Sequence, residues 1–519
     1  MRRFYMFLAA AVAGPLLSWG QTVALNGVSQ MSRSAISPIY ADKEVRGYLL
    51  YAKTDRADRK NDNYRLDFYD QDLGKVSSVT IQKPAERYEY LRNAFNGNTF
   101  VFYFRNLKTN DLELEAYDTN LQKTGEVIIP DVNLIEASLI SGDAHKSIEA
   151  TNAYGLLSLL PVPGKGFVRN GLDRAKLDRY GLEMYDSQLK LKWRAASDPK
   201  INTYEALTLT DASDKYLVGT LTRRPGYRSR EITGYMIAFD IETGRKVLDQ
   251  PISNGKTEQL SLNTFSYDPA KHEFIAVGEY YRPDDKALVD KSLGFFVRHF
   301  GEDGKVRNTK YIAWDKDVQP ALPPAPRATA ADGYVNFIHG VNKGANGNTY
   351  VVAEQYKVAA GLGGKASFLV GNSLVAGQVG DMLLFVLDPQ DGLRGVKSSP
   401  KDHSVVRLNG GVGYSGTGTV GQYMKTFHGF DYQFTQRNSA GTAFNSVYIN
   451  YDKEKGEDTK KVFGTVGFGD GTPFAVDRVE ANALATAAYV YPAKPGYVML
   501  VDYLSKQNQV NLKLVKLNI

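Results

Sequence analysis

One short pattern recurs along the whole chain: a strand-like run that ends in an apolar or aromatic residue and Asp, then a polar turn and a second apolar run. The Asp of the clearest copies is found at Asp70, Asp118, Asp186, Asp240, Asp388 and Asp452. Gly301 and Asn518 stand at the same point in two weaker copies. Because recurrence at intervals of tens of residues is typical of solenoids and propellers, this pattern constrains the fold more than any other feature of the sequence.

Each copy of the pattern predicts a β-hairpin. In the run LEAYD at 114–118, apolar and polar residues alternate as they do in a strand with one buried face. An Asp at the end of a strand accepts hydrogen bonds from a backbone N–H two residues later, which holds a tight turn. We expect the positive φ angles of such turns at Gly244, Gly304, Gly392 and Gly456.

A second pair of strands is expected before each hairpin, because runs rich in Val, Phe and Tyr precede the copies. These runs are 98–104, 215–220, 273–281, 348–356 and 496–504. Two hairpins make a four-stranded antiparallel unit, and a ring of such units is a β-propeller. The sequence therefore predicts an all-β fold, a β-propeller of eight four-stranded antiparallel blades, with seven blades as the alternative.

The two ends of the chain are expected to meet in one blade. The last copy, at 512–518, reaches the end of the sequence before its hairpin can be completed. We expect residues 22–30 to pair beside this copy and close the ring, which would remove free sheet edges. Residues 21–519 are then a single propeller domain.

One repeat is similar to a known family. The run AFDIETGRKVLDQ at 238–250 resembles one repeat of the quinoprotein-type propellers but lacks the terminal Trp of that repeat. The chain as a whole resembles the β-propeller superfamily and, within it, uncharacterised secreted bacterial propeller-like families. This resemblance implies a fold without an assigned activity, and we expect no cofactor.

The N-terminus predicts a secretion signal. Two arginines precede a short apolar core at 7–17, and small residues follow in 18–20 at the positions that a signal peptidase reads. We predict that 1–20 is a signal peptide cleaved before Gln21, and that the protein is exported to the periplasm, the cell surface or the medium. The sequence contains no Cys, which excludes disulfides and cysteine nucleophiles. No later stretch is long and apolar enough to suggest a transmembrane helix.

The formal net charge is +6 at pH 7, and two loops, at 164–180 and 222–231, are the most basic. Loops that join the second and third strands of each blade are expected to emerge on one face. The arginines proposed as ligand-binding residues are Arg169, Arg174, Arg179, Arg223, Arg224, Arg228 and Arg230. Because guanidinium groups suit carboxylate, sulfate and phosphate, this face predicts an anionic polysaccharide or an acidic protein as partner. The alternative is local pairing of these arginines with Asp and Glu in solvated loops.

Two histidines, His339 and His428, share a local context and fall where inner strands of blades are expected. They are therefore candidates for ligand binding in the central channel, with hydrogen bonding inside the blade as the alternative. Glu279 and Glu354 end equivalent strands and are candidates for the carboxylate pair of a glycosidase, with ordinary strand ends as the alternative. No two histidines have the spacing of metal ligands, so no metal site is predicted.

Two overlapping G-x-G-x-x-G strings, at 411–416 and 416–421, precede no helical pattern. We interpret them as a flexible loop, because a dinucleotide site needs this string between a strand and a helix. The aromatic residues are interpreted as blade core, so nucleic-acid binding is not expected.

These features favour a binding or scaffold role over catalysis. The preferred function is an exported, monomeric propeller that recognises an acidic glycan or partner through the basic loop face. One alternative is a glycan-active hydrolase or lyase with its site at the central channel. Another is a structural component of the cell envelope.

Overall fold

The structure is a computed structural model in which most of the chain is described. The described residues are 21–28, 35–41, 44–85, 87–130, 132, 136, 158–173, 179–200, 202–226, 229, 231–253, 257–323, 332–360, 375–402, 404–408, 415–452, 460–472 and 474–518. The predicted signal peptide at 1–20 lies outside these residues and stays a prediction.

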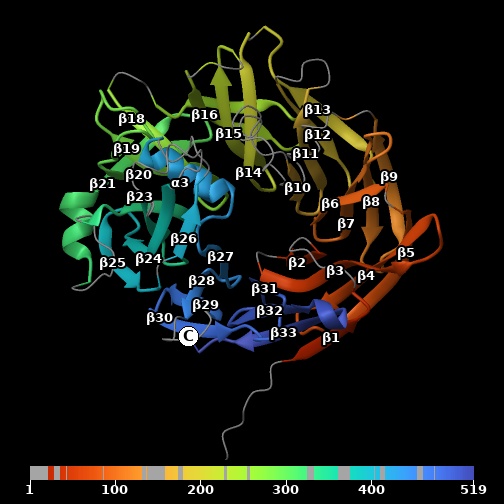
Figure 1. Cartoon of the computed structure of the whole chain (residues 1–519). Helices are drawn as coiled ribbons and strands as arrows, with labels where there is room; N and C mark the ends of the chain where they lie inside the picture. Colours follow the sequence, from red (N-terminus) through yellow and green to blue (C-terminus); the bar gives the residue numbers. More distant parts are fainter. Residues whose placement is uncertain are drawn as a thin grey trace, which may run out of the picture.

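The strands form eight antiparallel sheets, which are the blades of a ring around a central axis (Figure 1). Blade 1 consists of β2 (Ile36–Ala41), β3 (Glu44–Arg56), β4 (Asn61–Asp70) and β5 (Lys75–Pro84), and blade 2 consists of β6 (Tyr88–Phe95), β7 (Thr99–Asn106), β8 (Leu112–Asp118) and β9 (Lys123–Ile129). Blade 3 consists of β10 (Ser158–Val162), β11 (Gly166–Leu172), β12 (Tyr180–Tyr185) and β13 (Leu191–Ala196), and blade 4 consists of β14 (Tyr204–Ala212), β15 (Tyr216–Arg224), β16 (Thr233–Asp240) and β17 (Lys246–Pro251).

Blade 5 consists of β18 (Gln259–Asp268), β19 (Glu273–Tyr281), β20 (Gly294–Gly301) and β21 (Val306–Ala313), and blade 6 consists of β22 (Val335–Lys343), β23 (Thr349–Ala360), β24 (Val375–Leu387) and β25 (Leu393–Ser399). Blade 7 consists of β27 (Tyr432–Arg437), β28 (Ala443–Asp452), β29 (Lys460–Gly469) and β30 (Ala475–Glu480), and blade 8 consists of β31 (Ala487–Pro492), β32 (Tyr497–Leu504), β33 (Gln509–Lys516) and β1 (Thr22–Asn26). The predicted eight-bladed propeller is thus confirmed.

The Asp of the repeat closes the last hairpin of a blade, as predicted, in blades 1 to 4 and in blade 6. Between β4 and β5, Oδ1 of Asp70 accepts hydrogen bonds from the N–H groups of Asp72 and Gly74, each at 2.8 Å. Equivalent bonds are made by Asp118, Asp186, Asp240 and Asp388. A short local signal therefore sets the hairpin register over much of the ring.

Glycine supplies the positive φ angle of these turns only in part. Gly244 and Gly304 have φ of 69° and 74°, as predicted. The prediction is wrong for Gly392, because the preceding Asp391 takes the left-handed conformation, with φ of 62°. Gly456 lies outside the described residues.

In the last hairpins of blades 1 to 3, a leucine takes the left-handed conformation. Leu73, Leu121 and Leu189 have φ of 63°, 60° and 62°, a conformation that costs an ordinary residue about 1–2 kcal/mol. Each of the three side chains is buried in a hydrophobic cluster between blades. Burial of a leucine side chain is worth about 1.5–3 kcal/mol, which is enough to offset the backbone cost.

In blade 7 the recurring pattern falls on a different hairpin. Asp452 ends β28, so this copy connects the second and third strands, and its placement in the last hairpin of the blade was wrong. The segment 435–446 contains the turn from β27 to β28, so it does not connect the second and third strands. The reason is that an apolar run followed by Asp specifies a turn but does not specify which turn of the blade it is.

The N-terminal strand completes the last blade. β1 pairs antiparallel with β33 from Thr22 opposite Lys513 to Asn26 opposite Gln509. Leu25 of β1 packs in one cluster with residues of blade 8 and of blade 1. Similar clusters join the other neighbouring blades around the ring. The hydrophobic core is thus a set of layers shared between blades.

Blade 6 has an extension that the other blades lack in the described part of the chain. β26 (Ser404–Arg407) pairs with the first half of β24, and the helix α3 (Thr417–Thr426) follows it. The interpretation of 416–421 as a flexible loop is therefore wrong, while 411–414 lies outside the described residues. A Cβ on Gly416 or Gly418 would lie 2.0 or 2.8 Å from backbone atoms of the blade 5 loop, so only glycine allows this helix to dock so closely. No helix among the described residues is long and apolar enough to cross a membrane.

Candidate functional site

A pocket of about 720 Å³ opens between blades 5 and 6. One wall is the loop at 282–293, which joins β19 to β20, and another is the connection from β21 to β22. This connection contains the helical turns η3 (Trp314–Val318) and η4 (Gln319–Ala321). The volume is in the range of small-molecule sites, about 300–1,000 Å³.

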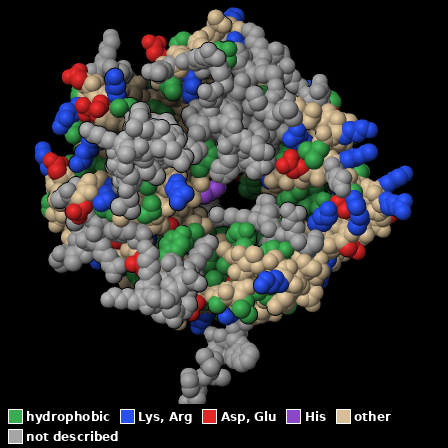
Figure 2. Space-filling view, in the orientation of Figure 1, with side chains coloured by type: hydrophobic (Ala, Val, Ile, Leu, Met, Phe, Trp, Pro, Cys, Tyr) green, Lys and Arg blue, Asp and Glu red, His purple; other side chains and the backbone are tan. Residues whose placement is uncertain are grey.

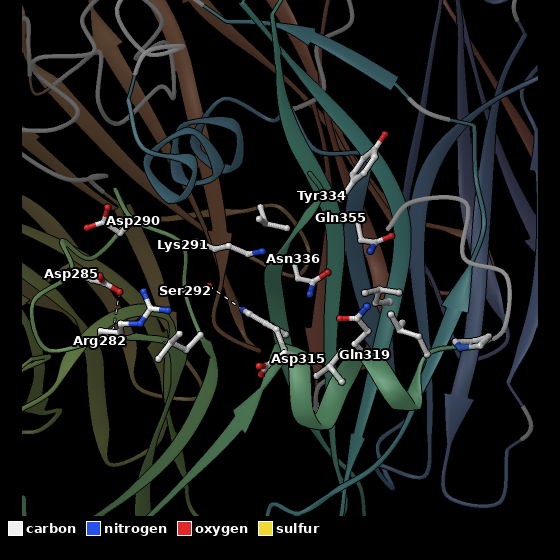
Figure 3. A pocket seen from close by; sticks show the side chains of 17 residues that line it. Arg282, Asp285, Asp290, Lys291, Ser292, Asp315, Gln319, Tyr334, Asn336 and Gln355 are labelled. Atoms are coloured by element: carbon white, nitrogen blue, oxygen red, sulfur yellow. Dashed lines mark hydrogen bonds between the residues drawn. The ribbon is translucent and has the colours of Figure 1, made fainter. Parts of the chain in front are cut away.

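The wall formed by blade 6 carries two amide oxygens that lack a hydrogen-bond donor in the described part of the chain. Asn336 of β22 and Gln355 of β23 lie next to each other in register and extend side by side into the pocket (Figure 3). Gln355 is only 4% exposed. Among the described residues, neither Oδ1 of Asn336 nor Oε1 of Gln355 has a hydrogen-bond donor. A buried acceptor without a donor costs about 1–3 kcal/mol, so this arrangement is typical of a site that a ligand completes.

The mouth of the pocket carries charges of both signs. Arg282 and Lys291 line it, and neither side chain has an ion-pair partner among the described residues. Asp285 and Asp290 each accept a hydrogen bond from a backbone N–H of their own loop. Asp315 lies at the start of η3. The pocket therefore has a neutral polar wall and a mixed rim, and its lining has no strong preference for one sign of charge.

A smaller chamber of about 190 Å³ adjoins the pocket beneath the first turn of α3. It shares Lys291 and Tyr334 with the larger pocket and is also lined by Glu279, Tyr281 and Tyr356. The OH of Tyr281 donates to Oε2 of Glu279 at 2.8 Å. Burial raises the pKa of Glu279 to about 7, although hydrogen bonds from Tyr281 and Ser292 oppose the rise. Glu279 is thus a carboxyl close to half-protonated at neutral pH.

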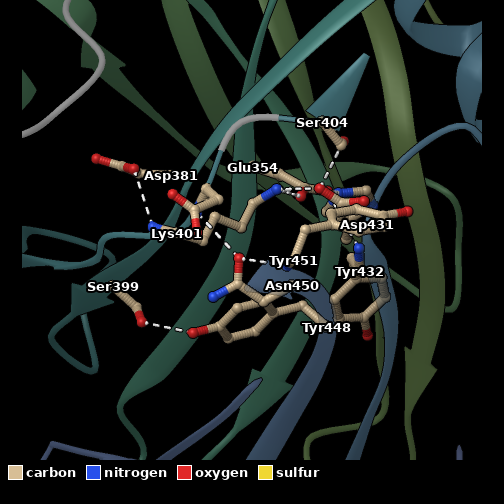
Figure 4. A network of polar contacts seen from close by, with 12 residues as sticks. Glu354, Asp381, Ser399, Lys401, Ser404, Asp431, Tyr432, Tyr448, Asn450 and Tyr451 are labelled. Carbon is tan, nitrogen blue, oxygen red and sulfur yellow. Dashed lines mark hydrogen bonds and ion pairs between the residues drawn. The ribbon is translucent and has the colours of Figure 1, made fainter. Parts of the chain in front are cut away.

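A buried ionic network lies on the other side of blade 6, toward blade 7 (Figure 4). Nζ of Lys401 is 2.9 Å from Oε1 of Glu354 and also contacts Oδ2 of Asp431. Oε2 of Glu354 is 3.1 Å from Nε2 of His339, and the N–H of Tyr432 donates to it at 3.2 Å. The side chains of Lys401, Glu354 and His339 have no exposed surface.

The charges in this network follow from burial and from one lysine shared by two carboxyls. Burial alone would raise the pKa of Glu354, but Lys401 and His339 lower it to about 2. Burial raises the pKa of Asp431 to about 6, and Glu354 adds to the rise. Burial lowers the pKa of His339 to about 4, so its ring is neutral at pH 7. The network therefore joins blades 6 and 7.

The first of the candidate arginines, Arg169, lies inside strand β11 and is 3% exposed. Its guanidinium is 3.1 Å from Glu183 and also contacts Glu136, and Nε donates to the OH of Tyr103 at 2.7 Å. Arg169 was predicted to lie in a loop, and this prediction is wrong because the residue belongs to a strand. All of its charge is compensated within the ring.

Three other candidate arginines lie beside a strand or at the end of one. Arg179 is 3% exposed and donates to the carbonyl of Asp198 at 3.0 Å. Arg223 and Arg224 are the last residues of β15, and Arg223 is bound to Glu205 and Asp249 at 2.7 and 2.8 Å. The remaining candidates, Arg174, Arg228 and Arg230, lie outside the described residues. On the face in Figure 2, Lys and Arg side chains are spread around the ring with Asp and Glu among them.

Arg223→Met is expected to act on stability more than on binding. Glu205 is 2% exposed, and the substitution removes its only ion-pair partner among the described residues, so we expect a loss of about 2 kcal/mol in the free energy of unfolding. Urea unfolding of the variant measures this loss. Lys310→Met, on the exposed outer strand of blade 5, is the control. An Arg223→Met protein as stable as the parent would contradict the pairing.

The histidine candidates have different positions. His339 lies in β22, an inner strand, as predicted, and its ring stacks on Tyr432 with centroids 4.4 Å apart. His428 is not in an inner strand, because it follows α3 in a turn with φ of 54°. Glu279 lines the chamber between blades 5 and 6, whereas Glu354 bonds to blade 7, so the two do not face each other as a glycosidase pair.

Comparison with known proteins identifies a family. The profile of a family of unknown function, DUF6770, matches residues 1–518. The chain belongs to the DUF6770 family. No curated protein matches this DUF6770 chain in sequence.

Some solved structures resemble this DUF6770 chain at low similarity. Prolyl oligopeptidase B from Galerina marginata has 9% identity and a TM-score of 0.41, over 91% of this chain and 55% of the peptidase. The chain thus spans about half the length of that protein. The β-propeller domain of the Trilobed protease from Pyrococcus furiosus has 8% identity and a TM-score of 0.37, over 84% of this chain and 92% of the domain. No activity is carried over from either protein.

Sequence reasoning missed the two amides of the pocket. Gln355 occupies the face of β23 that carries Val351 and Ala353, which both pack between blades 5 and 6. A polar residue in such a core-facing position is a signal that could have been found in the sequence. The site itself could not, because its other walls come from a loop and a connection far away in the chain.

Proposed function

We propose that this DUF6770 protein is an exported, non-catalytic binding propeller that takes a hydroxyl-rich ligand, of the glycan type, in the pocket between blades 5 and 6. The observation that carries the proposal is the pair of buried amide oxygens, on Asn336 and Gln355, that lack donors among the described residues. Each such oxygen is stabilised by a ligand that brings a hydrogen-bond donor into the pocket.

Sugars match this wall because each hydroxyl both donates and accepts. The amide groups of Asn336 and Gln355 offer the complementary pair of functions, an oxygen and an NH₂, on a rigid sheet. Trp314 adds an aromatic side chain to the lining, held by the bond from Nε1 to Oγ of Ser292 at 3.0 Å. A mostly preformed wall of this kind reduces the entropy lost on binding.

Gln355→Met tests the proposal, because it should stabilise the empty protein while weakening binding. The change removes a buried oxygen without a donor, so we expect a gain of about 1 kcal/mol in the free energy of unfolding. The measurement is thermal unfolding with and without glucose, glucuronic acid or a sulfated polysaccharide. The parent is expected to be stabilised by at least one of the two sugars, and Gln355→Met is expected to lose that stabilisation.

Gln436→Met is the matched control. Gln436 is also a buried glutamine, but its amide donates to the carbonyl of Tyr497 at 2.6 Å and accepts from the N–H of Ala493 at 2.9 Å. Its replacement should destabilise the protein. If Gln355→Met destabilises the protein in the same way, the amide has a structural role. If no saccharide raises the unfolding temperature of the parent, the proposed function is wrong.

The sulfated polysaccharide distinguishes binding in the pocket from binding by the arginine loops. Binding of an anionic polymer by the arginine loops, as the sequence predicts, should survive Gln355→Met. Export is tested separately, by N-terminal sequencing of protein recovered from outside the cytoplasm, where Gln21 is the expected first residue. Recovery of the chain from the cytoplasm with its first residues intact would contradict export.

A further inference from the structure

Glu279 is a half-buried carboxyl of β19 whose surroundings differ from those of the buried carboxyls Glu354 and Glu205. Glu354 and Glu205 are each bound to a lysine or an arginine. In the described residues, Glu279 has no cationic partner, and its contacts are the hydroxyl groups of Tyr281 and Ser292. A carboxyl in such surroundings lacks the counter-ion that its charged form requires.

The carboxyl faces an open chamber. The 190 Å³ space beneath α3 is lined by Glu279 together with three phenol rings, those of Tyr281, Tyr334 and Tyr356. The OH of Tyr356 donates a hydrogen bond to the carbonyl of Thr417 at 2.8 Å, which fixes this ring against the helix. A carboxyl and several aromatic rings around a small space are the chemistry that recognises an ammonium group.

We propose that this chamber is a subsite for a primary ammonium group on the ligand, with Glu279 as its counter-ion. The inference rests on the proposed function, because the chamber adjoins the larger pocket and shares the lining residues Lys291 and Tyr334 with it. The ligand is then a polyhydroxy amine, such as an amino sugar. Its hydroxyl groups meet Asn336 and Gln355, while its ammonium group reaches Glu279.

Binding is coupled to a proton. In the empty chamber burial raises the pKa of Glu279 to about 7, so about half of the molecules hold this proton at neutral pH. When an ammonium group enters, the carboxylate becomes the favoured form, and the proton passes to solvent. The titratable groups that face this carboxyl are Tyr281 on its own strand, Asp290 and Lys291 on the loop after it, Tyr334 before β22 and Tyr356 on β23. The helix α3 contributes only Thr417 and Gly418.

The test compares glucosamine with glucose and N-acetylglucosamine, which differ at one substituent of the same ring. Calorimetric titration of the parent at about pH 7 is expected to give a preference for glucosamine over glucose of about tenfold. In Glu279→Gln the preference should fall to about twofold or less, while glucose binding is retained. Asp315→Asn, a carboxyl at the rim of the larger pocket, should keep the preference and is the control.

Infrared spectra of the full chain give a second readout that a structural role would not move. The carbonyl band of the protonated Glu279, identified by its loss in Glu279→Gln, should disappear when glucosamine is added and persist when glucose is added. Equal affinity for the three sugars in the parent would overturn the subsite but leave the proposed function intact. Loss of the preference in Asp315→Asn as well would assign it to the rim. If none of the sugars binds, the proposed function itself fails.

Discussion

Lys401→Met should lower the free energy of unfolding by about 3–5 kcal/mol at neutral pH, which is the usual cost of removing one partner from a buried ionic group. The methionine fills the space of the aliphatic stem but leaves Glu354 and Asp431 without their cation in a site with almost no solvent. Urea unfolding at about pH 8 and about pH 5 measures the loss. It should shrink at the lower pH, because without Lys401 burial favours protonation of both carboxyls.

Lys397→Met is the control for this experiment. Lys397 lies on the exposed outer strand of the same blade, β25, so its replacement should change stability by only a few tenths of a kcal/mol. A Lys401→Met protein that unfolds at the same urea concentration as this control would show that the network does not hold blades 6 and 7 together. A loss that stays constant with pH would contradict the assignment of charge to the two carboxyls.

Glu279→Gln should change the pH dependence of stability by about 3–4 kcal/mol, since a pKa difference of one between the folded and unfolded chain is worth about 1.4 kcal/mol. Burial raises the pKa of this carboxyl from 4.5 to about 7 in the folded chain. Because the folded chain holds this proton more tightly than the unfolded chain, the contribution is full below about pH 4.5 and is lost as the pH rises through about 7. Glutamine cannot ionise and therefore removes the loss.

The expected result is that parent and Glu279→Gln have similar stability at about pH 4, and that the variant is the more stable at about pH 8. Chemical unfolding across this range measures the difference. Glu480→Gln, whose carboxyl is 72% exposed, should follow the parent throughout. Parallel curves for the parent and Glu279→Gln would mean that the carboxyl is solvated in the folded chain.

The fold could be predicted from the sequence because its signals are local and repeated. Asp70 and its counterparts close hairpins by hydrogen bonds that span only a few residues. Each copy of the pattern can therefore be recognised from its own short sequence. The exceptions have the same origin. Asp452 ends a strand as expected, but a signal for the end of a strand carries no information about which strands the next connection joins. Leu73 takes a glycine-like conformation because its side chain is buried against another blade, which only the assembled ring reveals.

The candidate site could be predicted far less well, because it depends on contacts between distant segments. The arginines were chosen for their charge, but Arg169 and Arg223 form ion pairs with carboxylates elsewhere in the ring. His339 was placed correctly on an inner strand, and its partner Glu354 was identified separately, but not the lysine that joins them to blade 7. Gln355 carries no charge and belongs to no motif, and its importance follows only from the lack of a donor near its oxygen among the described residues.

The hydrophobic layers between blades have a consequence for fragments of the chain. Because each layer takes its side chains from one blade and from the next, cutting the ring into two arcs leaves an apolar face at each end of each arc. Neither arc should be soluble when it is expressed by itself. Two complementary arcs expressed in the same cell would have matching faces and should reassemble, which makes the molecule a natural candidate for a split reporter.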